Sequence, residues 1–250
     1  MADPNKVAVY CDSYLTHDVA AELAGGAYGT VVLPYHDAND EMLRQNIQRL
    51  KSEGIVNNVL FSIGGDYKAI IVNKPAFKSA LAEAIGYYGI DGVDLDPEPA
   101  GAKIFDVVVE LTAFVASMGK MVTAAPSEHP QFWIEVLKAT GPQMAWWNLQ
   151  LYDGADYGAW VCAIVESGAM PTEVAQNFVV PGYNVAWSTP DAVAYELQGL
   201  KQLAAWLDGA FLRRYEDVRP RGAEWAKAVW SGLGTSRAEA ERPWRALVAG

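Results

Sequence analysis

The sequence predicts a single-domain α/β protein, a closed TIM (β/α)8 barrel, from its length, its strands and the order of its elements. The chain has 250 residues, about the size of one such barrel. Short apolar runs alternate with longer amphipathic segments, and most runs are continuously apolar, as in strands covered on both faces. Eight strands, each followed by a helix, form the repeat of a closed parallel barrel.

The expected elements follow one another in strict alternation. The predicted strands are Lys6–Tyr14, Thr30–Tyr35, Asn58–Ile63, Gly92–Asp96, Lys120–Ala125, Trp146–Tyr152, Asn177–Val180 and Gly209–Tyr215. The predicted helices are Asp18–Leu23, Asp40–Glu53, Pro75–Tyr88, Ala102–Met118, Gln131–Thr140, Tyr157–Glu166, Pro190–Leu207 and Arg221–Trp230.

The helix predicted after the second strand carries the clearest signal. Its apolar residues recur at helical spacing, with charged and amide side chains between them. Asn39 or Asp40 is expected to cap its amino end, and Gly54 to stop it. The apolar set is Met42, Leu43, Ile47 and Leu50.

An open doubly wound sheet is the alternative architecture. It is disfavoured because the first strand is followed by Tyr10-Cys11-Asp12-Ser13-Tyr14, which is no glycine-rich phosphate loop. No linker rich in proline or serine divides the chain. We therefore expect one barrel domain over residues 1–232 and a tail or short helix over 233–250.

Composition excludes several classes of protein. The chain is 51% hydrophobic and 20% charged, which argues against disorder, and its net charge of −11 argues against binding to nucleic acid or an anionic membrane. Two cysteines do not make a disulfide scaffold, and no apolar run reaches the roughly 18 residues of a membrane span. The N-terminus carries no basic and apolar signal, so the protein is either intracellular or has lost its signal.

The most informative segment is Ile90-Asp91-Gly92-Val93-Asp94-Leu95-Asp96-Pro97-Glu98. Side chains alternate along a strand, so Asp94, Asp96 and Glu98 are expected on one face, pointing into the barrel toward its carboxyl end. Barrel enzymes carry their catalytic groups at that end. Repulsion among three carboxylates raises the pKa of at least one. We expect Glu98 to be protonated as a general acid, with Asp96 holding or exchanging the proton.

Two other interpretations of these acids remain open. They could be structural acids satisfied by backbone groups or water. They could also bind a divalent cation, although no histidine or further acid cluster completes a coordination shell. We expect no metal and no cofactor.

The segment Asp91–Glu98 resembles the Asp-Gly-x-Asp-x-Asp-x-Glu signature of family 18 glycoside hydrolases, the chitinases and endo-β-N-acetylglucosaminidases. Three further strand ends, in the same chain order, are similar to motifs of this family, the second of them to that of its single-domain plant-type members. They are Ser62-Ile63-Gly64-Gly65, Thr123-Ala124-Ala125-Pro126 and Gln150-Leu151-Tyr152-Asp153. The resemblance covers roughly residues 6 to 218.

The resemblance implies a retaining hydrolase of β-1,4-linked N-acetylglucosamine, such as chitin, working by substrate-assisted catalysis. Glu98 would protonate the leaving sugar, Asp96 would orient the substrate's acetamido group, and Asp94 would tune Asp96. Tyr152 would donate to the acetamido oxygen, with Gln150 and Asp153 lining the same pocket. The expected partner is a polysaccharide or oligosaccharide substrate that contains N-acetylglucosamine. The protein itself is expected to be a monomer.

The chain departs from the family at the last strand. Arg213 takes the place of a tryptophan that usually forms the floor of the subsite for the reacting sugar. Trp187 or Tyr10 would then supply a substitute platform, and Arg213 would either stack on the sugar or pair with a carboxylate. The resemblance therefore leaves open a chitinase, an endo-β-N-acetylglucosaminidase acting on the chitobiose core of N-glycans, and a non-catalytic chitinase-like lectin.

Overall fold

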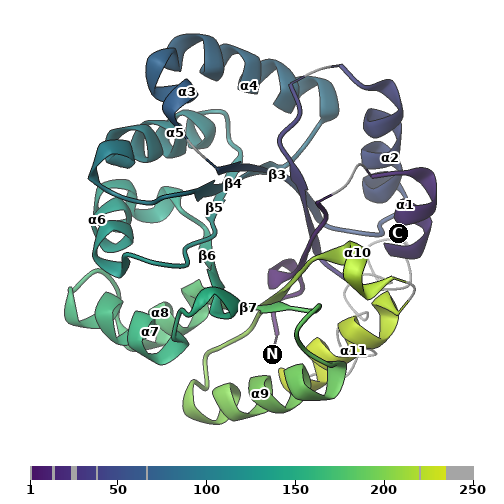
Figure 1. Ribbon diagram of the computed structural model, residues 1–250, viewed down its shortest axis with the longest axis vertical. Coiled ribbons are helices and arrows are strands. Elements are labelled where there is room, and N and C mark those ends of the chain that lie inside the picture. The colour runs from purple at the N-terminus through teal and green to yellow at the C-terminus, as the bar shows by residue number, and fades with distance from the viewer. Residues whose placement is uncertain are drawn as a thin grey trace.

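Eight parallel strands form a closed barrel in the computed structural model, which describes residues 2–12, 15–23, 27–37, 39–65, 67–219 and 221–234. The strands pair in chain order, and the last pairs with the first. Helices surround the ring of strands on its outside (Figure 1). The strands are β1 (Val7–Tyr10), β2 (Thr30–Pro34), β3 (Asn58–Gly65), β4 (Gly92–Pro97), β5 (Met121–Ala124), β6 (Trp146–Gln150), β7 (Val179–Asn184) and β8 (Ala210–Arg213).

This architecture confirms the predicted TIM barrel. Each of the eight expected strands coincides with or overlaps an observed one. The largest displacement is in β7, expected at Asn177–Val180 and found at Val179–Asn184. Asn177 instead belongs to helix α8 (Thr172–Phe178), where its side chain and carbonyl accept hydrogen bonds from buried Lys6.

The longer helices lie where the amphipathic segments predict them. Three short ones, α3, α8 and α10, were missed, since so few residues give only a weak periodic pattern, although α1, also of seven residues, was predicted. The helices are α1 (His17–Leu23), α2 (Glu41–Ser52), α3 (Lys68–Val72), α4 (Lys74–Tyr88), α5 (Phe105–Ser117), α6 (Pro130–Thr140), α7 (Tyr157–Glu166), α8, α9 (Pro190–Leu203), α10 (Tyr215–Val218) and α11 (Gly222–Gly232).

Helix α2 shows how local sequence sets an element's ends. Asp40 is its N-cap, with Oδ1 accepting a hydrogen bond from the Leu43 N–H at 3.0 Å, and Gly54 follows it with a φ of 64°. Both predicted signals are confirmed. Met42, however, is 57% exposed and does not belong to the buried face.

The alternation of side chains sorts each strand into an inner and an outer layer. In β4, Asp94 and Asp96 point into the barrel, whereas Val93 and Leu95 are completely buried in the outer layer. On the neighbouring β3, Ser62 pairs in register with Asp94 and Gly64 with Asp96. The inner face of β3 beside the two aspartates is therefore lined by small residues.

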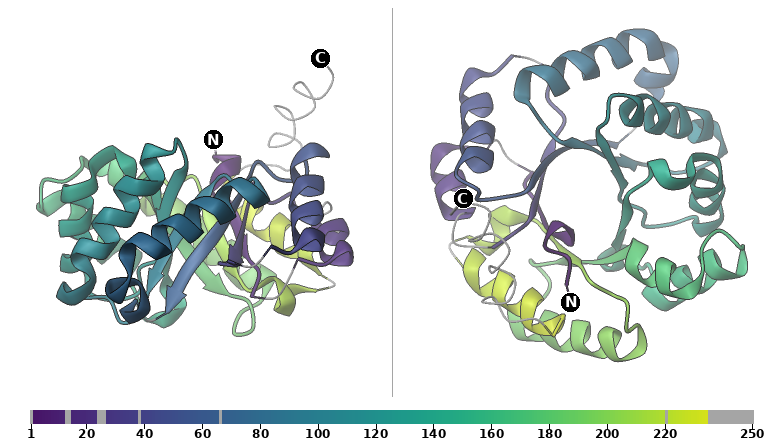
Figure 2. Two further views of the ribbon diagram at one scale, coloured as in Figure 1. Left: turned by 90° about the horizontal axis from the view of Figure 1, so that it is seen from above. Right: turned by 180° about the vertical axis from the view of Figure 1, so that it is seen from behind.

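The strands begin on the side of the ring where the N-terminal turn η1 (Pro4–Lys6) lies, as the view from behind shows (Figure 2). Because all eight strands are parallel, their carboxyl ends meet at the opposite side, which faces the viewer in Figure 1. Among the described residues, no helix is both long and apolar enough to cross a bilayer. Of the tail expected after residue 232, everything from residue 235 on lies outside the described residues.

Candidate active site

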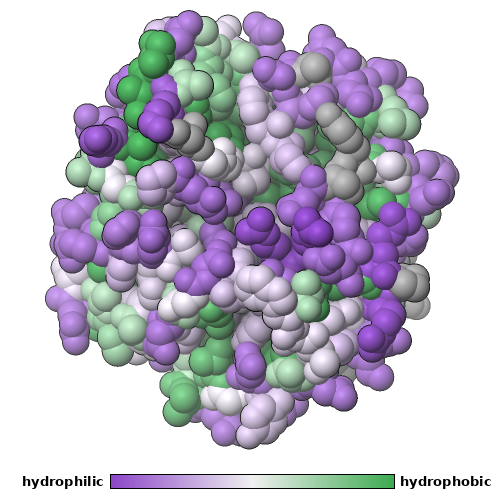
Figure 3. Space-filling model, in the orientation of Figure 1, coloured by the Kyte–Doolittle hydropathy of each residue, from purple (hydrophilic) through white to green (hydrophobic). Residues whose placement is uncertain are grey.

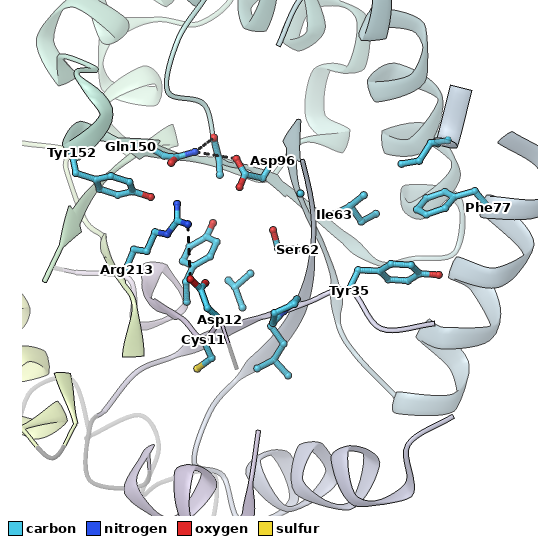
Figure 4. Close-up of a pocket in the computed structure, with 17 residues that line it drawn as sticks. Cys11, Asp12, Tyr35, Ser62, Ile63, Phe77, Asp96, Gln150, Tyr152 and Arg213 are labelled. Atoms are coloured by element: carbon cyan, nitrogen blue, oxygen red, sulfur yellow. Dashed lines mark hydrogen bonds and ion pairs between the residues drawn. The ribbon is translucent and has the colours of Figure 1, made fainter. Parts of the chain in front are cut away.

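A cavity of about 440 Å³ opens at the carboxyl ends of the strands, within the size range of small-molecule sites. Polar residues gather across the centre of this face of the molecule (purple in Figure 3). Strands β1, β2, β3, β4, β6 and β8 or the loops that follow them all contribute to the lining. The lining includes Tyr10, Asp12, Ser62, Asp96, Gln150, Tyr152 and Arg213, most of them labelled in Figure 4.

Asp94 lies beneath the cavity and is completely buried. Its carboxylate accepts hydrogen bonds from Tyr10 Oη at 2.9 Å, Thr123 Oγ1 at 2.5 Å and Asn148 Nδ2 at 3.1 Å. Burial raises the pKa of Asp94, and these donors, with the Ser62 hydroxyl, oppose the rise. This set of partners fixes the carboxylate in place under Asp96.

Asp96 is the strongest candidate for a catalytic acid or base. Burial raises its pKa to about 7, with the charges of Asp94 and Glu98 adding to the rise, while Arg213 and a hydrogen bond from Gln150 oppose it. The Gln150 Nε2 atom donates to Asp96 Oδ1 at 3.0 Å. A carboxyl group with a pKa near neutrality can both accept and return a proton at physiological pH.

Glu98 does not occupy the place that the alternation predicts. It is exposed and is not among the residues that line the cavity. Strand β4 ends at Pro97, so the two-residue period no longer applies to the next side chain. The Glu98 N–H instead donates to the Gly65 carbonyl at 3.0 Å. The proton expected on Glu98 is therefore better assigned to Asp96.

Arg213 and Tyr152 form the cationic side of the cavity. The Arg213 guanidinium carbon lies 5.9 Å from the centroid of the Tyr152 ring, and Arg213 Nη2 lies 3.9 Å from Asp12 Oδ2 (Figure 4). Burial raises the pKa of Tyr152 well above 10, and the Arg213 guanidinium opposes the rise. Tyr152 is therefore a protonated donor at neutral pH. The expected pairing of Arg213 with a carboxylate is found, with Asp12 as the partner.

Gln150 lines the cavity and positions Asp96. The side chain is 1% exposed, and its Nε2 is fixed by Asp96 and by the Ala125 carbonyl at 2.6 Å. Its Oε1 is buried and has no hydrogen-bond partner among the described residues. A buried acceptor without a donor costs free energy.

The remaining predicted residues divide between the site and the surface. Tyr10 lines the cavity, but its hydroxyl is held by Asp94, so it forms the floor. Asp153 and Trp187 do not line the cavity, and Trp187 is 72% exposed in the loop after β7. Asp12 was not identified as a site residue by the sequence analysis. Its position shortly after the end of β1 could have suggested it. The apolar lining residues Tyr35 and Phe77 were not indicated by the sequence either.

Within the ranges that the structure describes, no three histidine, cysteine, aspartate or glutamate side chains are grouped so as to hold a metal ion. The polar side chains that line the cavity include those of Asp12, Ser62, Asp96, Gln150, Tyr152 and Arg213.

Comparison with known proteins supports the fold and nothing finer. No protein-family model matches the sequence, and no curated protein matches it. A solved structure of D-psicose 3-epimerase in the presence of D-fructose has a TM-score of 0.55 at 13% identity, over 98% of this chain and 97% of that one. A putative dihydrodipicolinate synthetase from Pseudomonas aeruginosa has a TM-score of 0.53 at 10% identity, over 97% and 82% of the two chains.

A third similar structure is the BexX/CysO complex of Amycolatopsis orientalis, with a TM-score of 0.51 at 12% identity over 90% of this chain and 88% of that one. At these identities the likeness shows a shared barrel.

These findings correct the family assignment. The similar structures are named for an epimerase, a synthetase and the BexX/CysO complex, and no family model supports membership of family 18. The resemblance to family 18, and with it the chitinase, endoglycosidase and lectin functions, is wrong. The site agrees with this correction, because Glu98 lies outside the cavity and Tyr152 is paired with Arg213. Short motifs at strand ends recur on barrels of different function.

Proposed function

We propose that the protein is an enzyme that moves a proton at the carbon next to a carbonyl group in a small, neutral hydroxy-carbonyl compound. The observation that carries the proposal is the pKa of Asp96, raised to about 7 at the mouth of a barrel cavity that also presents Arg213 and Tyr152. Buried carboxyl groups perturbed in this way are enriched at catalytic sites. Epimerisation at a carbon beside a carbonyl, and isomerisation of a hydroxy-carbonyl compound through an enediol, begin with this step.

The reaction starts with the Asp96 carboxylate as the base. It removes the proton from the carbon beside the carbonyl, and the C–H electron pair becomes the C=C bond of an enediol. The carbonyl π pair moves to oxygen, where negative charge develops. Asp96, now protonated, can return the proton to the same carbon, which re-forms the substrate and lets its proton exchange with solvent. Delivered instead to the former carbonyl carbon, the proton forms a new C–H bond with the C=C electron pair, while the hydroxyl proton of the first carbon passes to the oxyanion and that carbon becomes the new carbonyl, which gives the isomer. A base with a pKa near the working pH serves both directions.

Arg213 and Tyr152 supply the donors for the developing oxyanion. The guanidinium is permanently cationic, and the phenol stays protonated because burial raises its pKa. Both belong to the cavity lining. Donors placed before the reaction stabilise charge without reorganising during it, which typically accounts for a factor of about 10² to 10³ in rate.

The charges around the cavity favour a neutral substrate over an anionic one. Arg213 is the cation of the lining, and it already faces Asp12 and Asp96. An added carboxylate or phosphate would meet these acids without a free counter-charge. A neutral hydroxyl next to the carbonyl meets no such repulsion and can donate to the acids of the lining.

The test is exchange of substrate protons with solvent. Acetoin, glyceraldehyde and dihydroxyacetone are incubated with the protein in deuterium oxide, and loss of the signal of the proton beside the carbonyl is followed by NMR. We expect exchange above the enzyme-free rate, reduced roughly 10²- to 10⁴-fold in Asp96→Asn.

Asp153→Asn is the matched control, because Asp153 is an exposed acid outside the cavity. It should exchange at the wild-type rate. Exchange no faster than in buffer with all three compounds would contradict the proposal, as would full activity in Asp96→Asn.

A further inference from the structure

The cavity extends beyond the barrel mouth. Its lining includes Ser62 and Gly64, on the inner face of β3, and Ile63, on the outer face of the same strand. Figure 4 shows Ser62 and Ile63 on opposite sides of the strand, with Tyr35 and Phe77 on the side of Ile63. One continuous cavity that touches both faces has to pass over the end of β3.

The end of β3 has no side chain that would block this passage. Gly64 has no side chain, and a Cβ there would lie 3.7 Å from Asp96 Oδ2, so the glycine is next to the catalytic candidate. Gly65 follows with a φ of 76°, a left-handed conformation that favours glycine. The two glycines thus turn the chain and leave an opening between the two parts of the cavity.

The part beyond β3, which we call the outer limb, is apolar. It is bounded by Leu33, Tyr35, Ile63, Ile70 and Phe77, none of which carries a charge. The rings of Tyr35 and Phe77 lie 5.5 Å apart between centroids and form its aromatic wall. Apolar surface left open beside a polar site gains free energy when a ligand covers it.

A second cavity of about 200 Å³ continues the outer limb. It shares Asp12, Leu33, Pro34 and Tyr35 with the first cavity and adds Leu15, His36 and Leu43. Most of its lining is apolar, and the available space exceeds what a short sugar or triose would fill.

We infer that the substrate is amphiphilic: a hydroxy-carbonyl head in the barrel mouth, joined to an aryl or alkyl group that crosses the glycines of β3 and fills the outer limb. The inference rests on the proposed proton-transfer function for the head group and names the substrate class. The length of the tail is set by the two connected cavities. The carbon that reacts lies at the inner end, beside Asp96.

The test compares two ketones that differ only in this group. Acetoin carries a methyl group where phenylacetylcarbinol carries a phenyl ring. Each is titrated by calorimetry into wild-type protein and into Asp96→Asn, which removes turnover from the binding signal. We expect phenylacetylcarbinol to bind roughly 10- to 100-fold more tightly than acetoin, from burial of the ring.

Adjacent isoleucines provide a matched pair of variants. Ile70 in α3 lines the outer limb and is 7% exposed, whereas its neighbour Ile71 is 40% exposed and does not line it. Ile70→Asp should abolish the preference for the phenyl ketone, and Ile71→Asp should keep it. Phe77→Ser, in α4, is a second variant with the same expected loss should Ile70→Asp fail to fold, and thermal melting checks each protein.

Equal affinity for the two ketones would overturn the inference, and so would a phenyl preference that survives in folded Ile70→Asp and Phe77→Ser. The outcome is separable from that of the proposed function. Proton exchange without a preference for the phenyl ketone would contradict only the inference of an amphiphilic substrate. A phenyl preference that depends on Ile70, in a protein that exchanges no protons, would support the outer limb and remove the proton-transfer function.

Discussion

Gln150 holds Asp96 in place: its Nε2 donates to Asp96 Oδ1 at 3.0 Å and to the Ala125 carbonyl at 2.6 Å. The donation stabilises the ionised carboxylate and opposes the burial that raises the pKa of Asp96 to about 7. In the proposed reaction Gln150 therefore acts through Asp96, as a positioning residue.

Replacing Gln150 by Met should move the pH dependence of the reaction. Loss of the donor raises the pKa of Asp96 further, and the base form is needed for proton removal, so the rise of kcat/KM with pH should shift to higher pH. The pH profile of deuterium exchange measures the shift. A profile that only falls in amplitude, with an unchanged midpoint, would contradict the role given to Gln150.

Arg213→Gln should lower kcat/KM by about 10- to 1000-fold, because the oxyanion loses its cation. It should also raise the midpoint of the pH profile, since the guanidinium opposes the raised pKa of Asp96. Arg221→Gln is the control, as Arg221 is exposed, is paired with Glu224 at 2.6 Å and does not line the cavity. Similar losses in both variants would show that the effect is one of surface charge.

Asp96 should make the folded state less stable as the pH rises. Its pKa is raised on folding, so between about pH 4 and pH 7 the folded protein binds more protons than the unfolded chain, and stability falls with increasing pH. Asp96→Asn removes this dependence. At pH 8 the variant should be more stable than the wild type by on the order of 1–3 kcal/mol, and the gain should vanish near pH 4.

Urea unfolding of both proteins at several pH values tests this expectation. A constant difference between them across the range would mean that the Asp96 carboxyl group titrates alike in the folded and unfolded states.

The buried Asp94 depends on its donors. Thr123→Val removes the shortest of them, the 2.5 Å hydrogen bond from Oγ1, and should destabilise the protein by about 1–3 kcal/mol. Thr112→Val makes the same change at another buried threonine, whose hydroxyl donates only to the Val108 carbonyl of its own helix, α5. In urea unfolding, Thr112→Val should lower the free energy of unfolding by less than Thr123→Val does. Equal costs would indicate that Asp94 does not need the Thr123 hydroxyl.

The barrel could be predicted from the sequence because its signals are local. Continuous apolar runs mark strands buried on both faces, and alternation within such a strand correctly put Asp94 and Asp96 on the inner face. The same rule failed at Glu98, one residue past the end of β4, because a side chain beyond the last paired residue no longer follows the strand's period. Trp187, expected as a substitute platform for the sugar, lies in the loop after β7, is 72% exposed and does not line the cavity.

Other features of the site depend on contacts between distant segments. The pairing of Arg213 with Tyr152 and Asp12 joins β8 to the ends of β6 and β1, and no spacing in the sequence encodes it. The outer limb needs β3, α3 and α4 side by side before Ile63, Ile70 and Phe77 can meet. The motif letters at the strand ends suggested a family, but only the assembled cavity shows which acid is buried beside donors.

The ionisation of Asp96 is the property on which the proposed reaction depends most directly. It is measured by titrating the protein with acid and base while recording the infrared difference between wild type and Asp96→Asn, in which the carboxyl and carboxylate bands of Asp96 remain. We predict a midpoint near pH 7. A midpoint near pH 4, the value of an ordinary exposed aspartate at about 3.9, would contradict the assignment of Asp96 as the base.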